Sequence, residues 1–123
     1  MNGKIVKIAV CDDDKQERKS IVRYIECYYH YGVVPILIQE LDGKEVLFDE
    51  LMHNGFDVVF VCFDGGAGIE AARKIRKMSN TCKVIMINNS SDFAIEAHNI
   101  WVNYYGIKPV RYDYICNALI HCE

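Results

Sequence analysis

The stretch FDVVFVCFDGGAGIEAARKIR, residues 56–76, decides the fold of this chain. Residues 58–63 form a continuous apolar run rich in valine and phenylalanine, which is typical of a strand covered on both faces. Three glycines follow and predict a loop, after which residues 69–78 have the helical period and a basic outer face. The stretch therefore predicts one strand–helix unit of an α/β protein.

The same alternation extends in both directions from this unit. At the first helix, Asp14 and Glu17 have the spacing of a capping box, and Pro35 favours an edge position for the second strand. Five strand–helix units predict a parallel sheet with helices on both faces, built as a single domain over residues 1–123. The further strands are predicted over residues 4–11, 35–41, 83–87 and 102–107, and the further helices between Asp14 and Gly32, between Asp42 and Gly55, and over residues 92–101 and 112–122.

Composition narrows the class of protein. Hydrophobic residues make up 51% and charged residues 25% of the chain, which is ordinary for a soluble domain. A net charge of −3 offers no basic field for direct contact with nucleic acid. The apolar runs are too short to span a bilayer and no signal-peptide layout is present, so a cytoplasmic protein without a membrane partner is expected. No two of the six cysteines lie three apart, which argues against a zinc ribbon or redox pair.

Polar side chains follow the predicted strands at the points where they end. Asp12 and Asp13 end the first strand, Cys62 ends the third, Asn88 ends the fourth and Lys108 ends the fifth. Ligands of open parallel sheets bind outside the carboxyl ends of the strands, so these groups are expected to lie together.

Three stretches resemble the receiver domains of bacterial two-component response regulators, especially those coupled to LytTR-type output domains. They are IAVCDDD at residues 8–14, the stretch at residues 56–76 already quoted, and VIMINNSSDFAIEAHNIWVNYYGIKPV at residues 84–110. The resemblance covers nearly the whole chain. It implies a flavodoxin-like (βα)5 fold, a doubly wound parallel sheet of five strands in the order 2-1-3-4-5, and a role in phosphorelay signal transduction.

The resemblance also implies roles for individual positions. Asp12 and Asp13 take the place of the family's Mg²⁺-binding acids, and Tyr105 takes the place of the aromatic residue that moves on activation. Asn88 and Lys108 occupy the two positions that contact the phosphoryl oxygens. Asn88 replaces the usual threonine or serine.

The phosphoacceptor position is Cys62 instead of aspartate, and the loop after it is two residues short. A thiol cannot form an acyl phosphate, and it is a poor ligand for Mg²⁺. The expectation is therefore a pseudo-receiver that regulates transcription through protein contacts, with no certain cofactor, at most a weak Mg²⁺ site and no enzymatic activity. Two alternatives within the family stay open: phosphorylation of Asp64, or redox regulation through Cys62. A flavodoxin-like domain that binds a small molecule is the alternative from another class.

The expected partner is a protein, either a histidine kinase or an output domain that binds DNA. The resemblance places its contact on the surface from Asp92 to Cys122, and a homodimer through the same surface is a further option.

Overall fold

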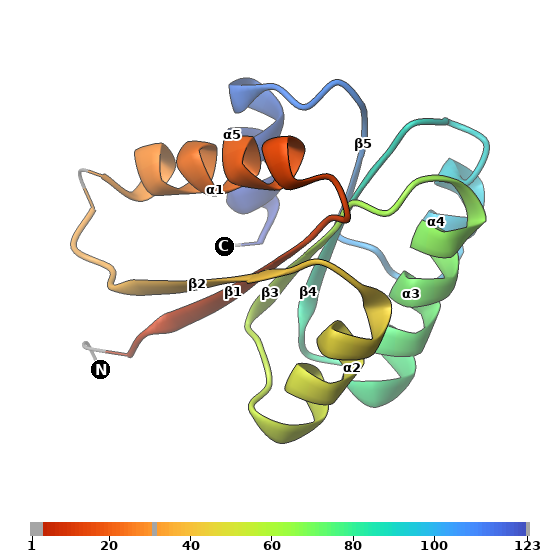
Figure 1. Cartoon of the computed structure of the whole chain (residues 1–123), viewed down its shortest axis with the longest axis horizontal. Helices are drawn as coiled ribbons and strands as arrows, with labels where there is room; N and C mark the ends of the chain where they lie inside the picture. Colours follow the sequence, from red (N-terminus) through yellow and green to blue (C-terminus); the bar gives the residue numbers. More distant parts are fainter. Residues whose placement is uncertain (1–3, 31, 123) are drawn as a thin grey trace.

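The structure, a computed structural model, describes residues 4–30 and 32–122, and within them five strands alternate with five helices (Figure 1). The strands are β1 (Val6–Cys11), β2 (Ile36–Leu41), β3 (Val58–Val61), β4 (Lys83–Asn88) and β5 (Tyr104–Ile107). The helices are α1 (Lys15–Tyr29), α2 (Lys44–His53), α3 (Gly65–Met78), α4 (Ala94–Asn99) and α5 (Tyr112–His121). None of the helices in these ranges is long and apolar enough to cross a membrane.

All strand pairs are parallel, and the order across the sheet is β2-β1-β3-β4-β5. Helices α1 and α5 cover one face, while α2, α3 and α4 cover the other (Figure 1). The predicted doubly wound fold is confirmed, and so is the edge position of the strand that follows Pro35. Each parallel crossover places a helix over the sheet, which is why a run of five strand–helix units closes into this three-layer form.

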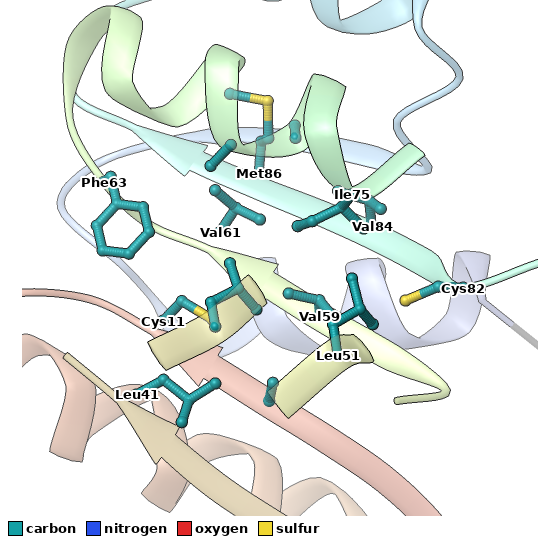
Figure 2. Packing of buried hydrophobic residues seen from close by; sticks show 14 of the residues in the cluster. Cys11, Leu41, Leu51, Val59, Val61, Phe63, Ile75, Cys82, Val84 and Met86 are labelled. Carbon is teal, nitrogen blue, oxygen red and sulfur yellow. The ribbon is translucent and has the colours of Figure 1, made fainter. Parts of the chain in front are cut away.

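The side chains of the central strand alternate between the two apolar layers. Val59, Val61 and Phe63 lie in the layer beneath α2 and α3, which Figure 2 shows from close by. Phe60 and Cys62 point the other way, into the layer beneath α1 and α5. This two-residue period is the ordinary pleat of a strand, and it directs the thiol of Cys62 into the core.

The start of α1 forms only half of the predicted capping box. Asp14 is the N-cap, and its side chain accepts a hydrogen bond from the backbone N–H of Glu17 at 3.1 Å. The reciprocal bond from Asp14 N goes instead to Asp12 Oδ1, at 2.9 Å. The side chain of Glu17 contacts Lys108 instead.

The predicted glycine loop after β3 is wrong, because α3 already begins at Gly65. Gly65, the first residue of α3, has φ of 62°, a left-handed conformation that glycine adopts without steric cost. At Gly68, a Cβ atom would lie 2.4 Å from the carbonyl oxygen of Phe63, so only glycine allows this close approach. Several elements are shorter than predicted. β1 begins at Val6, β3 ends at Val61 and β5 begins at Tyr104, while α4 covers only Ala94–Asn99. Trp101, two residues after the end of α4, has φ of 65° and does not continue the helix.

Candidate functional site

The carboxyl ends of the strands meet as predicted from their order. The backbone N–H of Cys62 donates to Cys11 O at 2.9 Å, and the backbone N–H of Lys108 donates to Asn88 O at 2.9 Å. The Lys108 ammonium reaches across from β5 to β3, where Nζ donates to Cys62 O at 2.7 Å. Three of the predicted site residues therefore come together at the carboxyl ends of the strands: Cys62, Asn88 and Lys108.

The ammonium of Lys108 is enclosed by acceptors of the chain itself. Its Nζ lies 2.6 Å from Glu17 Oε2 and 2.8 Å from Asp64 Oδ1, and the lysine side chain is only 13% exposed. Burial by itself lowers the pKa of Lys108, but the bonds to Asp64 and Glu17 outweigh it and raise that pKa above its usual value. The cation is thus fixed, charged and already paired.

Asp12 is fully buried next to this cluster, whereas Asp13 is exposed. Asp12 Oδ1 accepts from Asp14 N, but no donor among the described residues reaches its Oδ2. Burial, followed by the neighbouring carboxyl of Glu17, raises the pKa of Asp12 to about 8, against a weaker opposing effect of Lys108. Asp12 therefore takes up a proton at a higher pH than an exposed aspartate does.

The thiol of Cys62 is fully buried among apolar side chains. Burial, and then the nearby Asp12, raise the pKa of this thiol well above its usual value. Reactive cysteines are exposed and have lowered pKa values, so this environment favours an inert packing role.

The amide of Asn88 is buried and makes four hydrogen bonds. Its Nδ2 donates to Phe63 O and Gly65 O, both at 3.1 Å. Its Oδ1 accepts from Gly65 N at 3.2 Å and Ser90 N at 3.1 Å. These bonds use both donors and both lone pairs, so the amide fastens the β3–α3 connection and has nothing left for an anion.

Tyr105 is half-buried against the α3–α4 side of the core, and its hydroxyl donates to the carbonyl oxygen of Ser90. Burial raises the pKa of this phenol, so it remains a donor at neutral pH. The ring of Tyr105 therefore packs against the core, and its hydroxyl binds the β4–α4 connection.

The residues at this edge do not fit Mg²⁺. Within the described ranges, no group of three His, Cys, Asp or Glu side chains is arranged to hold a metal ion. Cys62 offers only a sulfur that is directed into the core, and the ammonium of Lys108 already lies beside the carboxylates of Glu17 and Asp64. A hard cation needs several anionic oxygens that are free to coordinate it, and these residues do not supply them.

Nothing in the sequence around Glu17 indicates that it belongs to the site. Its spacing from Asp14 fits a helix cap, and that local pattern masked a contact with a residue 91 positions further along the chain. Asp64 was considered only as a substitute phosphoacceptor. The structure pairs its half-exposed carboxylate with Lys108 instead.

No family model matches the chain. A curated relative, the sensory transduction protein LytR of Staphylococcus epidermidis, is 29% identical over 84 residues, which cover 67% of this chain and 33% of the relative. The chain thus spans about a third of the length of the curated relative that it matches.

Solved structures of receiver domains are similar over nearly the whole chain. A CheY-like receiver domain from Methylobacillus flagellatus superimposes with a TM-score of 0.79 at 15% identity, covering 98% of this chain and 100% of that one. The receiver domain of AraT, a response regulator from Geobacillus stearothermophilus, gives 0.78 at 20% identity, covering 97% and 93%. A two-component response regulator from Clostridium difficile gives 0.77 at 20% identity, covering 95% and 94%. Together with the strand order, these matches show that the chain has the fold of a CheY-like response-regulator receiver domain.

Proposed function

We propose that the chain is a pseudo-receiver, a signalling module with the receiver fold that acts through contacts with another protein and takes up no phosphoryl group. The observation that carries the proposal is the environment of Lys108. Its ammonium is already held by Glu17, Asp64 and the carbonyl oxygen of Cys62. Stabilising a transferred phosphoryl group requires cations and donors that face the incoming oxygens, and this cation faces the chain's own carboxylates.

Two further features of the same edge support the proposal. Cys62 has no carboxylate to form an acyl phosphate, and its sulfur is buried in the core. Asn88 spends all of its hydrogen-bonding capacity on the β3–α3 connection and on Ser90. An incoming phosphoryl group would have to displace Phe63 or Gly65 from the amide of Asn88 before that amide could donate to it.

The proposed partner surface runs from Asp92 to Cys122 over α4, β5 and α5. Ile95 and Trp101 are each 79% exposed there, and Tyr112 and Ile120 on α5 are also exposed. Exposed apolar side chains in one region are a feature of protein-binding surfaces. The proposed partners are a histidine kinase, an output domain that binds DNA, or a second copy of the chain, in the cytoplasm.

A second candidate function is phosphorylation of Asp64. Its side chain is 55% exposed and its Oδ1 lies 2.8 Å from Lys108 Nζ, so an acceptor carboxylate and a cation do stand together. Redox control through Cys62 has no comparable support, because the thiol is fully buried. The flavodoxin-like alternative has none either, since the acids after β1 would repel a phosphate.

The test is incubation with acetyl phosphate and Mg²⁺ followed by intact-mass measurement of the wild type, Asp64→Asn and Cys62→Ser. A pseudo-receiver gives no increase of about 80 Da, the mass of a phosphoryl group, in any of them. An adduct that is present in the wild type and Cys62→Ser but absent from Asp64→Asn would overturn the proposal in favour of the second candidate. A receiver domain with an aspartate phosphoacceptor serves as the reagent control.

A further inference from the structure

The strand β2 forms one edge of the sheet, and in Figure 1 the sheet ends with it. The approach to this strand and the strand itself are unusually apolar, with the sequence VVPILIQ over residues 33–39 and no charged residue among them. Val33 and Val34 are exposed, and the side chain of Leu37 is 57% exposed. An apolar edge strand is a template for pairing with another strand unless something protects it.

The direction of the backbone groups shows which residues are open. Val6 N donates to Pro35 O at 2.9 Å and Asp12 N donates to Leu41 O at 3.1 Å, so Pro35 and Leu41 face β1. Backbone polar groups alternate along a strand, and the register of β2 with β1 is continuous from Ile36 to Leu41.

The backbone N–H and C=O groups of Ile36, Ile38 and Glu40 therefore point outward. They have no hydrogen-bond partner among the residues that the structure describes.

The usual protection of an edge strand is missing here. Pro35 directs its nitrogen toward β1, so it removes no outward donor. Glu40, the one charged residue of β2, is neutralised by Arg18 at 3.0 Å and Lys19 at 2.8 Å. No free charge of the strand would repel an added strand.

Grooves border this edge on both faces of the sheet. The groove on the α1 side has a volume of about 530 Å³ and is lined by Val22, Tyr29 and Ile36, among others. The groove on the α2 side has a volume of about 220 Å³ and is lined by Leu37 and Phe56, among others. A strand added beside β2 would direct alternate side chains toward these two grooves.

We propose that β2 pairs antiparallel with β2 of a second copy of this chain about a two-fold axis at Leu37. This register sets the two Leu37 side chains opposite each other and places each Ile36 opposite Ile38 of the other copy, so that their outward N–H and C=O groups exchange hydrogen bonds. The pairing is self-complementary because β2 brings apolar side chains and no unpaired charge to it. The outer strand β2 lies at one side of the sheet. The surface proposed above for a protein partner, from Asp92 to Cys122, includes β5 at the opposite side.

A two-strand interface is small, so the dimer forms weakly, with a dissociation constant on the order of 100 μM. Sedimentation velocity from about 10 to 500 μM measures it for the wild type, Leu37→Lys, Met52→Lys and Ile95→Lys. Leu37→Lys puts like charges opposite each other at the two-fold axis and weakens the dimer at least about tenfold. Met52→Lys, at an exposed position of α2, and Ile95→Lys, on the α4 surface, leave it unchanged.

Amide hydrogen exchange at high concentration provides the second measurement. The N–H groups of Ile36 and Ile38 become protected in the wild type but not in Leu37→Lys. A wild type that stays monomeric to 500 μM, or a dimer that Ile95→Lys abolishes and Leu37→Lys does not, would overturn the inference. Thermal unfolding of Leu37→Lys verifies that the exposed substitution leaves the fold intact. The outcome is independent of phosphorylation, so its failure leaves the proposed function standing.

Discussion

At the scale of single residues, the partly buried ammonium of Lys108 is paired by carboxylates from two separate parts of the chain. Its Nζ lies 2.6 Å from Oε2 of Glu17 in α1 and 2.8 Å from Oδ1 of Asp64, the residue before α3. The cluster holds three acids around one cation, since Asp12 lies beside Glu17. The stability of this cluster therefore depends on the charge of Lys108 and on the proton that the raised pKa of Asp12 favours.

The dependence on the lysine predicts the effect of Lys108→Met. The change leaves Glu17 and Asp64 without their cation, so the free energy of unfolding should fall by about 1 to 3 kcal/mol, less than for a fully buried pair because water screens Asp64. Urea unfolding at neutral pH measures the difference. Lys77→Met, at an exposed lysine of α3, is the matched control, and a loss of the same size in both variants would contradict the prediction.

The dependence on the proton predicts a pH effect at Asp12. The native pKa of about 8 lies above the ordinary value of 3.8, so the native state keeps a proton that the unfolded chain has already released. The stability from this proton is complete below about pH 4 and is lost as the pH rises through about 8.

Asp12→Asn is neutral at every pH and keeps an oxygen for Asp14 N. It should be more stable than the wild type by about 1 to 3 kcal/mol at pH 8 to 9, with the difference shrinking toward pH 4. Thermal unfolding across this range measures it. Asp13→Asn, at the exposed neighbour, serves as the control, and a difference that stays constant with pH would contradict the assignment.

At the scale of elements, the beginning of α3 controls the geometry of the site. The helix starts within three residues of Cys62, and its first turn is tied to β4 through the amide of Asn88. Gly68 allows this because its backbone packs against Phe63 O and Asn88. The β3–α3 connection and the buried amide of Asn88 are thus held together by these hydrogen bonds.

The close contact at Gly68 predicts a large difference between two neighbouring glycines. Gly68→Ala places a methyl group against a carbonyl oxygen and an amide, which should destabilise the fold by about 2 to 4 kcal/mol. Gly66→Ala meets nothing within 4 Å and should be neutral or stabilising by about 0.5 kcal/mol, because alanine has less backbone entropy to lose. Chemical denaturation of both variants tests this, and equal effects would show that α3 does not begin where the structure places it.

At the scale of the whole molecule, the burial of each cysteine determines how fast it reacts with a thiol reagent. A buried thiol reacts only after the fold around it opens. Cys27 is exposed on α1, whereas Cys11, Cys62 and Cys82 are buried in the core. Iodoacetamide should label Cys27 within minutes in native buffer, and Cys62 only at a rate that follows global unfolding as urea is added. Peptide mapping by mass spectrometry reads out each site. Labelling of Cys62 as fast as Cys27 would instead restore the redox alternative.

The alternation of strands and helices was predictable because each element has its own short-range period of apolar residues. The strands were predicted close to their observed bounds, and Pro35 correctly indicated the edge strand. The start of α3 was not predictable, since three glycines in four residues ordinarily indicate a loop. Tertiary contacts of Gly68 with Phe63 and Asn88 override that weak local preference.

The sequence by itself determined the order of strands and helices, the apolar faces that bury them, and the kinds of groups that end each strand. It also determined that a thiol follows β3, because the identity of Cys62 is read directly from the sequence. Only the tertiary structure decided which of these groups touch. The pairing of Lys108 with Glu17 and Asp64 joins three separate parts of the chain, and no periodicity encodes the distance between charges that are brought together only when the sheet closes.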